Sequence, residues 1–158
     1  MTERPDSEKM LRQLASLCAR SEQCTYDLRL KMHRKGLTPD EIARNMQYLI
    51  DNRFVDDERY ARSLATDKVR FAGWGRRKIA AHLIAKKIPS AVIREAMEAI
   101  DPRDYKEALV RAARAKARTL DLNVRDDRNK MLRHLVSRGF EPALAIKIIE
   151  AIVKRISS

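Results

Sequence analysis

The residues with the clearest chemical potential form a positive run in the middle of the chain. Between residues 68 and 87 there are seven Lys and Arg residues and no Asp or Glu. The seven are Lys68, Arg70, Arg76, Arg77, Lys78, Lys86 and Lys87. Such side chains attract phosphates or carboxylates. The run therefore predicts binding to a nucleic-acid backbone or to an acidic protein surface, although a solvated helix pair could have the same composition.

Two aromatic residues lie within this run, and rings among cations can pack, stack or hold a cation. Phe71 continues an apolar helical stripe, so we expect it in the core. Trp74 lies between Gly73 and Gly75 in an expected loop, where it can serve either packing or binding. We count Trp74 with the candidate binding residues.

A second basic group follows in the C-terminal third of the chain. Arg111, Arg114 and Arg118 have the spacing i, i+3 and i+7, which places them on one face of a helix. We expect this row to extend the basic surface of the central run.

The sequence contains no recognisable catalytic arrangement. There is no phosphate-binding glycine loop, HExxH segment or serine-histidine-acid spacing, and only four glycines are present. His82 and His134 occupy equivalent positions beside apolar stripes without the acids or cysteines of a metal site. We therefore expect no enzyme, metal, cofactor or small-molecule substrate.

The composition favours a small helical protein with a polyanionic partner. The chain has 158 residues, a net charge of +12, and 44 % hydrophobic but only 5 % aromatic residues. Cys18 and Cys24 are spaced neither as a redox pair nor as zinc ligands, which suits a reducing compartment. With no signal peptide or membrane-spanning stretch recognisable, we expect a cytoplasmic protein that does not bind a membrane.

An internal repeat organises the elements that carry these residues. The offset is 51 residues between Leu28 and Ile79, and 52 residues between Ile79 and Met131. Further apolar positions correspond at the same offsets, namely Met32, Leu83 and Leu135, and then Leu37, Ile88 and Phe140. Their spacing is that of buried helix stripes. We expect an all-α protein, with three tandem three-helix repeats in an elongated, curved array.

The repeat register predicts the same turn three times. Gly36, Lys87 and Gly139 occupy the position after a helix where the chain turns left-handed, and a proline follows closely each time. Lys87 should therefore be held in a strained conformation. We expect a disordered start over residues 1–8 and repeats over residues 9–54, 55–100 and 101–158.

The residues from Phe54 to Ser63 and from Gly73 to Ile79 resemble the central repeat of RecX proteins. The first segment reads FVDDERYARS, and the second reads GWGRRKI and is followed by Leu83 and Lys86. Lys87 and Arg76 depart from the Gly and the Pro that are common in that family. Tandem three-helix repeats also match the family, so the resemblance extends over nearly the whole chain after residue 8.

The resemblance implies a regulatory protein that binds the RecA–DNA filament and inhibits RecA strand exchange and ATPase activity, with weak electrostatic affinity for DNA. The alternative is a general nucleic-acid-binding helical module, because each helix pair resembles a helix-turn-helix. The expected second helices carry several acids, Glu95 and Glu98 among them, which disfavours reading of bases by those helices.

Overall fold

The structure is a computed structural model that describes residues 6–157, and within this range every regular element is a helix. The helices are α1 (Ser7–Arg20), α2 (Thr25–Arg34), α3 (Pro39–Asp51), α4 (Asp57–Asp67), α5 (Arg76–Ala85), α6 (Ser90–Glu98), α7 (Pro102–Ala117), α8 (Arg125–Ser137) and α9 (Pro142–Ser157). A short π-helical segment, η1 (Lys68–Ala72), continues α4. The expected all-α class is confirmed.

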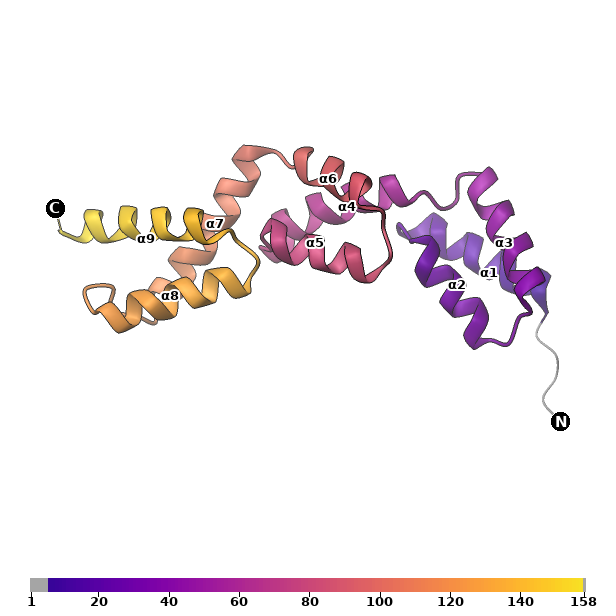
Figure 1. Cartoon of the computed structure of the whole chain (residues 1–158), viewed down its shortest axis with the longest axis horizontal. Helices are drawn as coiled ribbons and strands as arrows, with labels where there is room; N and C mark the ends of the chain where they lie inside the picture. Colours follow the sequence, from indigo (N-terminus) through magenta and orange to yellow (C-terminus); the bar gives the residue numbers. More distant parts are fainter. Residues whose placement is uncertain (1–5, 158) are drawn as a thin grey trace.

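The helices group in threes along the chain. Figure 1 shows α1–α3, α4–α6 and α7–α9 following one another along the long axis of the molecule, with the two termini toward opposite ends. The second and third helix of each group form the pair found by the repeat register. Tandem three-helix units and the elongated shape are therefore confirmed.

The turn inside each helix pair has the same geometry three times. Gly36, Lys87 and Gly139 have φ values of 89°, 61° and 99°. The N–H of the next residue donates to a carbonyl five residues earlier, as when Ile88 N donates to Leu83 O at 3.2 Å. That bond is typical of a Schellman ending, in which the apolar residue after the turn packs back onto the helix. The left-handed conformation predicted for Lys87 is confirmed.

Side-chain caps begin several helices at the residues that the sequence indicates. Thr38 and Glu41 form a reciprocal capping box at α3, and Asp56 accepts from the N–H groups of Glu58 and Arg59 at α4. At the N-terminus, Asp6 caps α1 in the same way, so the helix begins at Ser7. The disordered start expected over residues 1–8 is therefore wrong for 7–8, and residues 1–5 lie outside the described residues.

Two apolar cores hold the array together. The first repeat has a core of its own, which includes Leu28, Met32 and Leu49. The second and third repeats share one continuous core, in which Leu83 and Leu135 are fully buried. The second and third repeats therefore form one packed unit, and the first joins it through a smaller contact.

Phe71 does not lie in the core, and the expectation for it is wrong. Its side chain is 83 % exposed. The reason is the π-helical segment η1, in which the chain takes more residues per turn than in an α-helix. The stripe of α4 is therefore rotated, so that Val69 turns inward and Phe71 turns outward.

Candidate partner-binding surface

Arg76, one of the predicted binding residues, joins the second repeat to the third. Its guanidinium carbon lies 3.8 Å from the centroid of the Tyr105 ring, and Nη1 lies 3.3 Å from Oε2 of Glu141. The Tyr105 hydroxyl donates to Glu141 at 2.6 Å and accepts from the Arg76 N–H at 3.1 Å. Burial and the Glu141 carboxylate raise the pKa of Tyr105. Arg76 is therefore committed to a contact inside the molecule.

The loop before Arg76 packs tightly on the turn between α8 and α9. Gly75 N–H donates to the Arg138 carbonyl at 2.8 Å, and Arg77 N–H donates to the Gly139 carbonyl at 3.0 Å. The Arg138 side chain donates to the carbonyls of Ala72 and Gly73. A Cβ at Gly75 would lie 2.2 Å from the carbonyl carbon of Gly139, so only glycine permits this approach. The contact fixes where the central basic run faces.

Two further predicted residues are engaged in ion pairs between repeats. Arg70 Nε lies 2.8 Å from Asp104 in α7, and Lys86 Nζ lies 2.8 Å from Asp27 in α2. In each pair the hydrogen bond to the acid raises the pKa of the base. Arg70 and Lys86 therefore help to hold neighbouring repeats, and their positive charge is partly neutralised.

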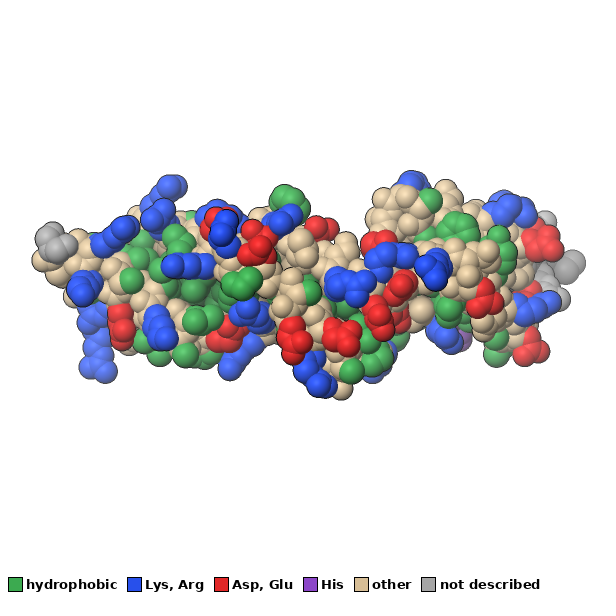
Figure 2. Space-filling model, turned by 90° about the horizontal axis from the view of Figure 1, so that it is seen from above, with side chains coloured by type: hydrophobic (Ala, Val, Ile, Leu, Met, Phe, Trp, Pro, Cys, Tyr) green, Lys and Arg blue, Asp and Glu red, His purple; other side chains and the backbone are tan. Residues whose placement is uncertain are grey.

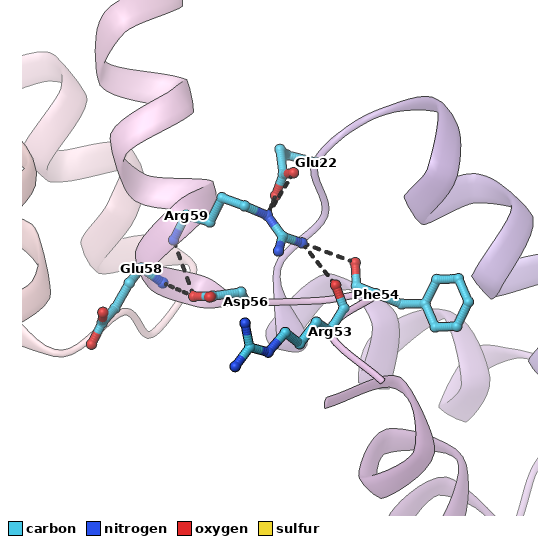
Figure 3. Close-up of polar contacts among 6 residues, drawn as sticks. All are labelled: Glu22, Arg53, Phe54, Asp56, Glu58 and Arg59. Atoms are coloured by element: carbon cyan, nitrogen blue, oxygen red, sulfur yellow. Dashed lines mark hydrogen bonds and ion pairs between the residues drawn. The ribbon is translucent and has the colours of Figure 1, made fainter. Parts of the chain in front are cut away.

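A similar polar junction joins the first repeat to the second (Figure 3). The Arg59 Nε lies 2.8 Å and 3.0 Å from the two Glu22 carboxylate oxygens, and Nη2 donates to the carbonyls of Arg53 and Phe54. These contacts hold the end of α1 and the α3–α4 linker against α4. The Arg59–Glu22 pair is half-exposed, so salt should screen it. Beside it, Cys24 of the first repeat is fully buried in the core of the second and third repeats.

Trp74 forms a cluster with two lysines and a histidine. Lys68 Nζ and Lys78 Nζ lie 4.7 Å and 4.6 Å from the centroid of its ring, and the His82 ring packs against it at 5.8 Å between centroids. Burial, with help from Lys86 and Lys68, lowers the pKa of His82, which favours the neutral imidazole near pH 7. We call Lys68, Trp74, Lys78 and His82 the Trp74 cluster. The rings of this cluster pack on each other, and its lysines leave a half-exposed positive surface.

Two members of the central run remain uncommitted. Arg77 and Lys87 are both exposed, and neither side chain has an ion pair or hydrogen bond among the described residues. They lie near opposite ends of α5, on which Lys78 is also carried. The exposed charges of Arg77 and Lys87 therefore contribute little to the stability of the fold.

The row on α7 is also exposed. Arg114 and Arg118 have no side-chain partner in the described part of the chain, and Arg111 donates to the carbonyl of Arg70 at 3.0 Å. The α7 row therefore meets the central run at Arg70 in η1, through Arg111, and not at α5. Apolar residues of α7 and α9, Val110 and Ile152 among them, form a groove beside this row that sequence reasoning did not indicate. Its signal was present in α9, which has more apolar residues than one buried stripe requires.

The two cysteines of the described chain are free thiols whose pKa values are raised. Burial raises the pKa of the Cys24 thiol to about 11, and Cys18 is also a free thiol with a raised pKa. No group of three or more His, Cys, Asp and Glu residues within residues 6–157 is placed to hold a metal ion. None of the helices in that range is long and apolar enough to span a bilayer.

Comparison with known proteins decides the family. Residues 56–97 match the profile described as "RecX, second three-helix domain". Regulatory protein RecX of Vibrio parahaemolyticus is 30 % identical over 124 residues, which cover 78 % of this chain and 79 % of that protein. The chain belongs to the RecX family. RecX of Pasteurella multocida is also 30 % identical, over 86 % of this chain and 83 % of its own.

Solved RecX structures share the fold at low sequence identity. The crystal structure of RecX from Lactobacillus salivarius has a TM-score of 0.74 at 19 % identity, and the match covers 96 % of both chains. A second crystal structure of a regulatory protein RecX has a TM-score of 0.77 at 18 % identity over 92 % of this chain and 71 % of that one. The arrangement of helices is therefore that of RecX proteins, and as a member of this family the chain is a regulatory protein rather than an enzyme.

Proposed function

We propose that the chain binds the RecA–DNA filament and inhibits the recombinase and ATPase activities of RecA, and so modulates recombination and DNA repair. Membership of the RecX family supports this role. The observation that carries it on the molecule itself is the stretch from residue 68 to residue 87. It holds seven cations and no acid, and Arg77 and Lys87 are exposed without partners among the described residues.

The proposed surface is helix α5 with the Trp74 cluster beside its first turn. Arg77 and Lys87 supply free charge, while Lys68 and Lys78 are held in place over the Trp74 ring. The tight packing of Gly75 on Gly139 makes the second and third repeats one body. A rigid body of two repeats can contact neighbouring protomers of a filament and stabilise one of its conformations over another, and this shift would inhibit RecA.

We also propose a direct contact with DNA and a cytoplasmic location. Net charge of +12 favours a weak, salt-sensitive contact with the DNA that the filament carries. Two free thiols, one of them buried, are consistent with a cytoplasmic protein.

The test is a double charge reversal at the two uncommitted residues. Arg77→Glu with Lys87→Glu leaves the ion pairs and hydrogen bonds between repeats in place, whereas a change at Arg76 would break the pair with Glu141. ATP hydrolysis by RecA on single-stranded DNA is measured against the concentration of each variant. We expect the concentration for half-inhibition to rise by about tenfold or more, because reversed charges repel an acidic partner and slow association.

A matched control separates a local surface from net charge. Arg62→Glu with Arg94→Glu changes the same net charge in the same repeat, on α4 and α6, where both side chains are exposed. Inhibition by this control should stay near that of the unchanged chain. An equal loss of inhibition in both variants would show that net charge, and not the α5 surface, is responsible. Full inhibition by a folded Arg77→Glu, Lys87→Glu variant would refute the assignment of α5.

A further inference from the structure

A groove with an apolar floor runs along the third repeat between α7 and α9. Its first part has a volume of about 420 Å³ and is floored by Leu109, Val110, Leu144 and Ile148. A second hollow, lined by α7 residues alone, shares Lys106 and Val110 with the first part. It shares Arg114 with a third hollow, which is floored by Ile152 and Ile156. The apolar side chains thus follow both helices through most of their length. Ile156 is 53 % exposed, so part of this floor faces solvent.

The rim of the groove is positive. Eight cations line it, namely Arg76, Arg103, Lys106, Arg111, Arg114, Arg118, Lys147 and Arg155. The side chains of Lys106, Lys147, Arg114 and Arg118 have no partner among the described residues. Glu107 is the one acid among the residues that line these hollows. Figure 2 shows apolar side chains with Lys and Arg around them over the end of the molecule that holds the third repeat.

We propose that this groove is a docking site for an acidic amphipathic helix of a partner protein. An apolar stripe with the i, i+3, i+4, i+7 spacing would lie on the Leu and Ile floor, as in other helix-in-groove complexes. Its flanking carboxylates would face the rim cations. Helix α7 has 16 residues, and a partner helix of the same length spans about 24 Å. Arg76 at the start of α5 borders the first part of the groove, but Arg77 and Lys87 do not line it. The inference does not depend on the proposed action on RecA.

Charge and floor chemistry disfavour the other occupants. A second copy of the chain would bring the same positive rim and a net charge of +12 against the groove. Single-stranded nucleic acid binds through aromatic platforms, but the floor is aliphatic. The one aromatic residue of the lining, Tyr105, is 4 % exposed and lies under the Arg76 guanidinium. A polyanion would therefore engage the rim and leave the apolar floor uncovered.

The probe is a fluorescein-labelled synthetic peptide of about 16 residues with Leu on one helical face and Glu along its flanks. A second peptide has the same composition in a shuffled order, so that its leucines share no face. Fluorescence anisotropy with the full chain measures both affinities, and oligo-dT is added as a competitor. We expect the amphipathic peptide to bind at least about tenfold more tightly than the shuffled one, because only the former covers the floor.

Two pairs of variants locate the site. Ile156→Asp places a charge on the floor, and Ile146→Asp makes the same change at an exposed position of α9 outside the groove. Lys106→Glu with Lys147→Glu reverses the rim, and Arg62→Glu with Arg94→Glu is its control of equal net charge. We expect each groove variant to weaken peptide binding by about tenfold and each control to stay within about twofold.

Circular dichroism and melting curves first establish that each variant is folded. Equal binding of the two peptides, or equal loss in Ile156→Asp and Ile146→Asp, would overturn the inference. If oligo-dT displaces the peptide and Ile156→Asp weakens oligo-dT equally, the groove is a nucleic-acid site and the inference is also overturned.

Discussion

Replacing Lys87 with glycine should stabilise the protein, although it removes a side chain. Lys87 has φ of 61°, a conformation that Gly36 and Gly139 adopt at the same place in the flanking repeats. Its N–H donates to the Ile84 carbonyl at 3.0 Å, a backbone contact that glycine keeps. The exposed lysine side chain has no ion pair or hydrogen bond with any described residue. The substitution therefore changes backbone energetics and little else.

The magnitude follows from two opposing effects. The left-handed conformation costs a residue with a Cβ about 1–2 kcal/mol, and glycine escapes this cost. Glycine also has more freedom in the unfolded chain, which costs about 0.5–1 kcal/mol on folding. The net gain in free energy of unfolding should be about 0.5–1 kcal/mol. For a chain of this length, each 1 kcal/mol shifts Tm by about 2–4 °C.

The assay is urea unfolding followed by circular dichroism, with Lys87→Ala as the matched control. Alanine also removes the lysine charge but retains the Cβ, so Lys87→Ala should not gain the same stability. A higher midpoint for glycine alone, at unchanged denaturant slope, is the expected result. If Lys87→Gly is no more stable than Lys87→Ala, the strain argument fails.

Three further perturbations test the fold and its ionisation. Leu83→Ala should lower the free energy of unfolding by about 2–5 kcal/mol, because the side chain is fully buried. The surface control Lys106→Ala should change it by no more than about 0.5 kcal/mol. Similar melting of the two variants would contradict the repeat register. Gly75→Ala should loosen the second repeat from the third, since its Cβ would lie 2.2 Å from backbone in the facing turn, and unchanged hydrogen-exchange protection of that turn would argue against the contact. Burial and neighbouring cations lower the pKa values of His82 and His134 in the folded chain. As the pH falls below about 6.5, the unfolded chain therefore takes up protons before the folded chain, and the free energy of unfolding should decrease. Urea unfolding at several pH values measures this. Rising stability on acidification over that range would contradict this account.

The sequence was sufficient for features that depend on local spacing. The apolar positions and the three turns recur at nearly constant offsets, so the helix pairs and the left-handed Lys87 could be predicted without knowledge of the packing. The capping box of Thr38 and Glu41 is equally local, and it forms as expected. The capping box depends on two residues three positions apart, and the turns were found because the same short pattern occurs three times in the sequence.

The contacts between repeats could not be predicted in this way. Glu141 lies 65 residues after Arg76, and the two meet because Gly75 allows close packing on the α8–α9 turn. The positive run therefore included cations that the fold neutralises. Phe71 was misplaced for a related reason, since one π-helical turn rotates everything after it and no residue in η1 signals that change.

The arrangement has a consequence for function. Arg70, Arg76 and Lys86 maintain the orientation of the repeats, while Arg77 and Lys87 stay available for a partner. Loss of inhibition after a change at one of the first three residues would therefore have two explanations. Changes at Arg77 and Lys87 test the surface without this ambiguity.

The most direct test of the central claim compares binding of the chain to RecA–DNA filaments and to the same single-stranded DNA without RecA. Immobilised DNA, with or without a RecA filament assembled on it, is titrated with the chain over a range of salt concentrations. The account predicts that binding to the filament persists at salt concentrations that abolish binding to bare DNA, because bare DNA offers mainly screened phosphate charge. Equal affinities with the same salt dependence would contradict it and identify a general nucleic-acid-binding protein.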